Sequence, residues 1–120
     1  MNADALHLLG VLSNQKQQYK AAVDLIIRAI QIFPNQPIYH NNLGNAYRDS
    51  GHYEQAIVCY HNALQIKPDL SEAYINLGIT YHQLADLDRA VVAFAVTQAN
   101  GIRLAQERPC LPGVQVTAFH

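Results

Sequence analysis

The sequence predicts an all-α fold, a solenoid built from three helix-turn-helix hairpins. A Leu-Gly pair recurs every 34 residues, and small, aromatic and proline positions recur with the same period. Within each unit the apolar residues follow helical spacing in two separate blocks. A fixed period of roughly 20–50 residues is typical of repeat architectures. The recurring positions are Leu9-Gly10, Leu43-Gly44 and Leu77-Gly78; Ala22, Ala56 and Ala90; Ile26, Tyr60 and Phe94; and Pro34 and Pro68.

The period divides the chain into three units, residues 3–36, 37–70 and 71–104, followed by a tail over 105–120. In the second unit the apolar spacing predicts one helix from Ile38 to Ser50 and another from Tyr53 to Ile66. Gly51, between them, is typical of a helix C-terminal turn. Pro68 cannot continue the helix before it, so it marks the passage to the next unit. One hairpin cannot bury its apolar face alone, and we therefore expect the three units to stack.

The third unit departs from the pattern near its end. Thr97 stands where the other units have alanine, and Ile102 stands where they have proline. The prolines and the glycine at 109, 112 and 113 predict an irregular tail over 108–120, while a short helical extension over 102–105 stays open. Because the first unit begins almost at Met1, the sequence also leaves open whether the chain is a fragment of a longer array.

The charge balance does not favour a nucleic acid or membrane partner. Eight Lys and Arg face nine Asp and Glu, giving a formal net charge of −1. No apolar run reaches the roughly 18–20 residues that a membrane-spanning helix needs, and the N-terminus lacks the basic region of a secretory signal. Two cysteines, Cys59 and Cys110, are too few for a disulfide framework. We therefore expect a protein of a reducing compartment, the cytoplasm.

The sequence contains no recognisable catalytic or metal-binding motif. The six histidines form neither a zinc-protease motif nor a Cys-x-x-Cys and His set. Helical geometry points the side chains of Cys59 and His61 roughly 200° apart. This spacing favours a buried cysteine beside a surface histidine over the alternative, a redox or metal site. We therefore predict no catalytic residue, no metal and no cofactor, and the chain by itself is not predicted to be an enzyme.

The aromatic residues of the repeat could form either a ligand cage or the packing between helices. Their recurrence at fixed positions favours packing, since thin repeats need large apolar side chains. The residues concerned are Tyr47, Tyr60, Tyr74, Tyr81 and Phe94.

The second unit carries the most specific motif of the chain. It consists of Asn42-Leu43-Gly44-Asn45-Ala46-Tyr47, Gly51, Tyr53, Ala56-Ile57, Tyr60, Ala63-Leu64 and Pro68. This motif resembles the tetratricopeptide consensus, and the resemblance covers residues 3 to about 98. It implies a right-handed α-solenoid that binds other proteins. The segments 5–12 and 40–45 are further similar to repeats ahead of bacterial transferase domains, and to the arm of the O-linked N-acetylglucosamine transferase family.

The concave side of such an array is lined by the first helix of every unit, and it is the predicted binding groove. Asn42 and Asn76 lie there, 34 residues apart. An Asn amide both donates and accepts, so a row of them can pair with the backbone of an extended peptide. In the resembling transferase family an asparagine ladder at this position holds acceptor peptides, and Asn42 and Asn76 match it whereas Leu8 does not. The alternative is local hydrogen bonding between helices. The predicted groove residues are Asn41, Asn42, Asn45, Arg48, Asp49, Asn76, Ile79, His82 and Gln83.

A second known use of the resembling fold, a clamp for a C-terminal carboxylate, is not supported by the sequence. Heat-shock co-chaperones hold such a carboxylate with Lys and Arg around Asn. The corresponding positions lack basic residues here, so the charge-assisted bonds of a clamp are missing. They are His7, Asn41 and Ile75 in one column, and Asp4, Ile38 and Glu72 in the other.

We therefore expect a protein-interaction scaffold that holds an extended peptide or a helix in its concave groove. The alternative is the N-terminal substrate-presenting arm of a glycosyltransferase-like enzyme. The predicted partner is a protein or peptide, with no nucleic acid and no membrane. We also expect self-association, with two ends stacked on each other across a two-fold axis, because the first and last hairpins carry apolar residues at the open ends of the stack.

Overall fold

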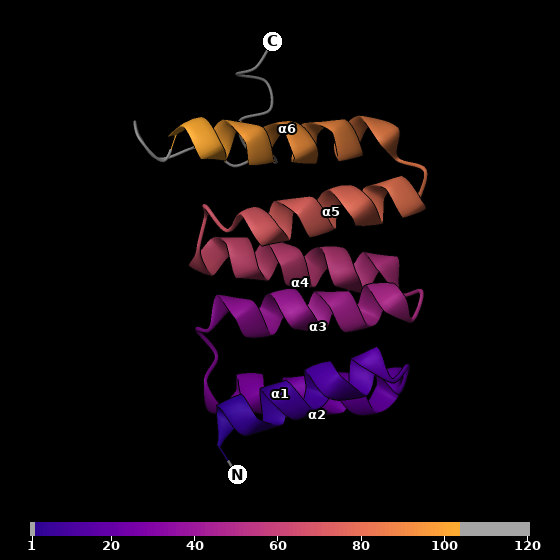
Figure 1. The fold of residues 1–120 in the computed structure, drawn as a ribbon, viewed down its shortest axis with the longest axis vertical. Coiled ribbons are helices and arrows are strands. Elements are labelled where there is room, and N and C mark those ends of the chain that lie inside the picture. The colour runs from indigo at the N-terminus through magenta and orange to yellow at the C-terminus, as the bar shows by residue number, and fades with distance from the viewer. Residues whose placement is uncertain (1, 104–120) are drawn as a thin grey trace.

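The computed structural model describes residues 2–103, except the side chains of Leu87 and of residues 98–103. Its elements are six helices in chain order (Figure 1): α1 (Ala3–Gln15), α2 (Tyr19–Ile32), α3 (Pro37–Asp49), α4 (Tyr53–Ile66), α5 (Ser71–Gln83) and α6 (Leu87–Arg103). Over these residues there is no strand, so the predicted all-α class is confirmed. The predicted irregular tail over 108–120 lies outside the described residues.

The helices pair into three antiparallel hairpins that stack in order along the long axis of the molecule (Figure 1). The pairs α1–α2, α3–α4 and α5–α6 form the hairpins, and α2 packs on α3 as α4 packs on α5. The first helices also contact one another, α1 with α3 and α3 with α5. These three helices therefore form one continuous layer, whose outer surface we call the first-helix face.

The turn inside each hairpin has the same backbone geometry. Gln17, Gly51 and Ala85 have φ values of 63°, 88° and 62°. The N–H after each of them donates to a carbonyl five residues back, as from His52 to Tyr47 at 2.8 Å. This pair of features is the Schellman motif that ends many helices. Only the second hairpin has glycine at the left-handed position.

Prolines set the ends of α2 and α4, which finish at Ile32 and Ile66, two residues before Pro34 and Pro68. In the third hairpin Ile102 takes the place of proline, and α6 continues to Arg103. The helix is therefore 17 residues long, compared with 14 in α2 and α4. The sequence left such an extension open, and the described part of it is present.

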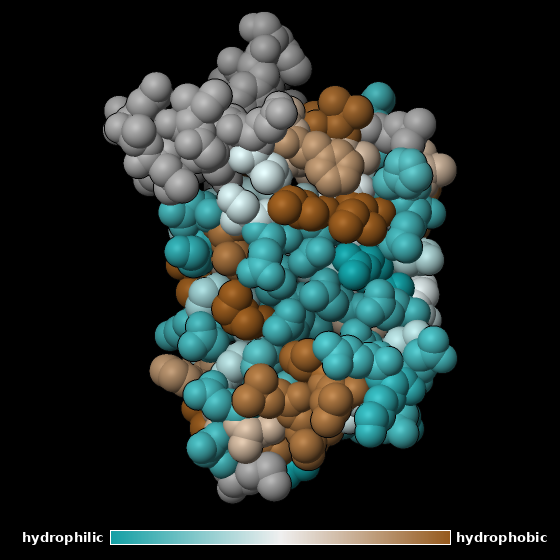
Figure 2. Space-filling view, in the orientation of Figure 1, coloured by the Kyte–Doolittle hydropathy of each residue, from teal (hydrophilic) through white to brown (hydrophobic). Residues whose placement is uncertain are grey.

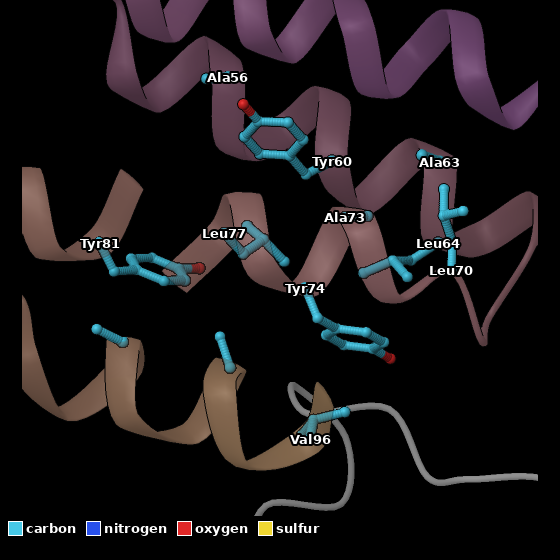
Figure 3. Packing of buried hydrophobic residues seen from close by; sticks show 12 residues of the cluster. Ala56, Tyr60, Ala63, Leu64, Leu70, Ala73, Tyr74, Leu77, Tyr81 and Val96 are labelled. Atoms are coloured by element: carbon cyan, nitrogen blue, oxygen red, sulfur yellow. The ribbon is translucent and has the colours of Figure 1, made fainter. Parts of the chain in front are cut away.

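The core lies where helices of neighbouring hairpins meet. The predicted small-residue column is buried at all three positions, Ala22, Ala56 and Ala90. Figure 3 shows the cluster between the second and third hairpins, where Tyr60 comes from α4 and Tyr74 lies between α5 and α6. Both tyrosines are fully buried, which confirms the packing interpretation for them. Phe94 differs, because it is partly exposed although its ring lies against Gly78.

Candidate functional site

The first-helix face combines two apolar areas with a polar centre. Figure 2 shows hydrophobic surface over α1 and over α5, with hydrophilic surface between them. The exposed apolar side chains include Leu8 on α1 and Ile75 and Ile79 on α5. The predicted groove residues of α3 lie between these two areas. A partner on this face would thus meet hydrogen-bonding groups in the middle and apolar side chains on both sides.

Hydrogen bonds between the first helices hold the polar centre together, and four of them share one sequence separation. The Tyr39 hydroxyl donates to the Asp4 carboxylate, and Asn42 Nδ2 lies 2.8 Å from His7 Nε2. Asn14 donates to Asp49 at 2.9 Å, on the same two helices, and all three pairs are 35 residues apart. Each residue faces the position that follows its repeat equivalent on the next first helix. The separation is therefore one residue more than the repeat of 34.

The fourth pair with this separation joins α3 to α5. Asn76 Nδ2 donates to Asn41 Oδ1 at 3.0 Å. Asn41 is 1% exposed, so its amide is not available at the surface. Its carbonyl would be left buried and unpaired without Asn76, at a cost of about 1–3 kcal/mol. Asn41 therefore serves the contact between helices, which is the alternative that the sequence left open for these asparagines.

Asn42 and Asn45 are half-buried and bonded to their neighbours. Asn45 Nδ2 donates to Asn42 Oδ1 at 3.3 Å, and Asn45 Oδ1 accepts from the Tyr60 hydroxyl at 2.7 Å. An Asn amide has two donor hydrogens and two acceptor lone pairs. Each of the two amides thus keeps capacity for a further partner while its position is fixed by the protein.

Arg48 is the only Lys or Arg within α1, α3 and α5. Its guanidinium donates to Asn76 Oδ1 at 3.2 Å and lies 3.4 Å from the Asp49 carboxylate. Asp49 also accepts from Asn14. The single positive charge of this face is therefore paired within the protein.

The remaining predicted residues, Ile79, His82 and Gln83, are exposed on α5. They lie on the C-terminal half of that helix. The structure thus keeps eight of the nine predicted residues at or near the surface of the first-helix face, and buries Asn41.

His7 belongs to this site although it is not one of the nine predicted groove residues. It is buried, its ring lies 4.6 Å from that of Tyr39, and burial lowers its pKa while the nearby Asp4 opposes this shift. An Asn Nδ2 group only donates, so His7 Nε2 accepts this bond and the imidazole is neutral. A search for pairs of polar residues 35 positions apart, instead of 34, identifies both His7 and Tyr39.

Two observations concern chemistry away from this face. Cys59 is buried, as predicted, and its burial raises the pKa of the thiol to about 12, while His61 is exposed. Over residues 2–103 no three His, Cys, Asp or Glu side chains are grouped in a way that could hold a metal ion. None of the helices α1–α6 is long and apolar enough to cross a lipid bilayer.

Three sequence models of one repeat family match the chain. Two are described as tetratricopeptide repeat and match residues 3–36 and 25–58, and one described as TPR repeat matches 44–84. Together they span residues 3–84, more than half of the chain.

Solved structures of this kind are similar over most of the described residues. The crystal structure of MamA is 28% identical, with a TM-score of 0.80, and the match covers 88% of this chain and 61% of that one. The Sgt2 TPR domain from Aspergillus fumigatus is 30% identical, with a TM-score of 0.78, and the match covers 82% of this chain and 66% of that one. The second TPR of Spaghetti (RPAP3), bound to the HSP90 peptide SRMEEVD, is 20% identical, with a TM-score of 0.76, covering 82% and 92%. The chain thus spans about three fifths to two thirds of the first two proteins.

Proposed function

Because this chain belongs to the tetratricopeptide repeat family, we propose that it is a protein-interaction scaffold that binds a peptide segment on its first-helix face. The observation that carries this proposal is the arrangement of that face. Exposed Leu8, Ile75 and Ile79 flank a centre of half-buried amides. Apolar area supplies affinity, and amides fixed in position pair with a peptide backbone without demanding a particular sequence.

The charge of the face indicates which peptides it suits. The structure of the second TPR of Spaghetti holds the HSP90 peptide SRMEEVD, so a fold of this kind accommodates a short peptide. Here the first helices carry one basic residue, Arg48, which is already paired with Asp49. An acidic C-terminus would find no uncompensated Lys or Arg within these three helices. We propose instead a peptide with apolar side chains spaced to reach both α1 and α5.

Selection of peptides from a random phage-displayed library on the intact chain tests the proposal. Selected peptides are then titrated calorimetrically against Leu8→Asp and Ile79→Asp. Both side chains are exposed, so the variants should fold, and each introduces an unpaired charge into an apolar contact. We expect each variant to weaken binding at least tenfold, which corresponds to about 1.4 kcal/mol.

Val58→Asp is the matched control, since Val58 is an exposed valine on α4, outside the first-helix face. It should bind like the unaltered chain. The proposal is wrong if the selected peptides bind both first-helix variants with unchanged affinity, or if the control loses binding to the same degree.

The alternative function, an arm that presents protein substrates to a transferase domain, would use the same face. No contact within residues 2–103 favours it over a free-standing scaffold, and the similarity to transferase arms stays a prediction.

A further inference from the structure

The clearest difference between the hairpins lies on the side of each first helix that faces the preceding hairpin. Three positions, repeated every 34 residues, face that way on α3 and α5, and they are buried in both helices. On α1 the equivalent positions are exposed, with Leu9 and Leu12 each at 47%. The positions are Tyr39, Leu43 and Ala46 on α3, Ala73, Leu77 and Thr80 on α5, and Ala5, Leu9 and Leu12 on α1.

The structure shows what covers this side inside the molecule. α2 covers it on α3, and α4 covers it on α5. In the second of these junctions Ile57 and Tyr60 of α4 share one apolar cluster with Leu77 of α5. Within residues 2–103 no helix lies in the corresponding place against α1.

The opposite end of the stack has the complementary feature. Val91 and Phe94 on α6 are equivalent to Ile57 and Tyr60, which pack toward the next hairpin. Tyr60 is fully buried and Ile57 partly buried, whereas Val91 is 66% exposed and Phe94 is 41% exposed. Among residues 2–103, one end of the stack therefore presents the α4 half of the junction, and the other end presents the α5 half.

We propose that copies of this chain associate head to tail, with the α6 end of one copy packed on the α1 end of the next. The contact repeats the junction that α4 and α5 already form within one copy, so its geometry and its apolar character are built into the fold. The alternative is a two-fold contact of like ends. It would set α1 against α1, or α6 against α6, which none of the junctions between the described helices resembles. The formal net charge of −1 opposes neither arrangement appreciably.

A head-to-tail contact leaves one open end on each copy, so it extends with concentration instead of closing at a dimer. Sedimentation velocity of the full chain should therefore give a weight-average sedimentation coefficient that rises continuously with protein concentration. Leu9→Lys blocks the α1 end and Val91→Lys blocks the α6 end. Leu9 is 47% exposed and Val91 is 66% exposed, so neither change should prevent folding, and circular dichroism verifies this.

The two variants distinguish the arrangements when they are mixed. Each variant alone should sediment as a monomer, because one half of every contact is blocked. An equimolar mixture should form dimers and nothing larger, since the intact α6 end of one variant meets the intact α1 end of the other. Val58→Lys, an exposed valine outside both ends, should associate like the unaltered chain.

Three results would overturn the proposal. The unaltered chain could stay monomeric at the highest concentration reached. One variant alone could associate like the unaltered chain, which is the behaviour of a two-fold contact through its intact end. The mixture could remain monomeric, which would mean that the two ends do not recognise each other.

Discussion

Gln17 and Ala85 take up a backbone conformation that side chains other than glycine disfavour. Their φ values of 63° and 62° match the position of Gly51 in the middle hairpin. A residue with a Cβ atom loses roughly 1–2 kcal/mol in the left-handed region, whereas glycine loses only about 0.5–1 kcal/mol through its greater freedom in the unfolded chain. The turns of the first and third hairpins are therefore strained in a way that the second is not.

We expect Gln17→Gly to raise the free energy of unfolding by about 0.5 kcal/mol, the balance of these two contributions. Chemical denaturation with circular dichroism measures the change. The reciprocal control is Gly51→Ala, where a Cβ would meet no atom within 4 Å, so that only backbone strain is added. An unchanged midpoint in both variants would show that the turns tolerate either residue.

His7 should make stability depend on pH. Burial lowers its pKa below the ordinary value of 6.5, and its bond with Asn42 requires a neutral ring. The unfolded chain therefore takes up a proton at a higher pH than the folded protein does. The stability that the neutral ring contributes is fully present above about pH 6.5 and is lost as the pH falls below this value.

His7→Gln tests this dependence, because Gln keeps an acceptor for Asn42 but does not titrate. Between about pH 8 and about pH 5 the unaltered chain should lose more stability in urea titrations than the variant. Parallel pH profiles for the two proteins would mean that His7 titrates alike in the folded and unfolded states.

At the scale of the helix pair, glycine permits the close contact of α3 with α4. A Cβ at Gly44 would lie 2.6–2.9 Å from three ring atoms of Tyr60. That ring is fully buried and its hydroxyl is bonded to Asn45, so it cannot move aside easily. The third hairpin has the same arrangement with Gly78 and Phe94, but the ring of Phe94 is partly exposed and can shift toward solvent.

We therefore expect Gly44→Ala to be clearly more destabilising than Gly78→Ala. Overpacking typically costs about 1–3 kcal/mol, and the better helix propensity of alanine returns up to about 1 kcal/mol. The free energy of unfolding should therefore fall for Gly44→Ala and stay nearly unchanged for Gly78→Ala. Thermal unfolding of the two variants gives the comparison, and equal losses would show that the exposure of Phe94 gives its ring no freedom.

The elements could be predicted because each is signalled by residues close together in the chain. The predicted span of α4, Tyr53 to Ile66, agrees with the structure, since Gly51 and Pro68 bound it closely. The length of α6 was harder to predict, because no proline follows it at the expected place. The absence of a helix-terminating residue does not determine where a helix ends.

The candidate site was less predictable, because its contacts join different repeats. Asn41, Asn42 and Asn76 look alike in the sequence, yet Asn41 is buried and the other two are half-buried. The difference follows from the offset between stacked first helices, which places residue 41 against residue 76. A period of 34 aligns equivalent positions, but four of the hydrogen bonds between the first helices connect positions 35 apart.

For the whole molecule, the distribution of charge should determine how binding on the first-helix face responds to salt. Arg48 is the one cation of that layer, and Asp49 and Asn76 already occupy its guanidinium. Binding of selected peptides should therefore rest on apolar area and neutral hydrogen bonds, neither of which is screened by ions. Between about 0.1 and about 1 M NaCl the Debye length falls from roughly 10 to roughly 3 Å. Over this range we expect Kd to change by less than about threefold, or below roughly 0.7 kcal/mol.

Asp49→Ala provides the contrast, because it removes the carboxylate beside Arg48 and leaves the guanidinium charge uncompensated. This variant should bind acidic peptides more tightly than the unaltered chain does, and that gain should disappear at high salt. Isothermal titration of one neutral and one acidic peptide against both proteins gives the four salt profiles. A steep salt dependence of the neutral peptide on the unaltered chain would contradict the expectation, since the charges responsible would then have to lie outside the layer formed by α1, α3 and α5.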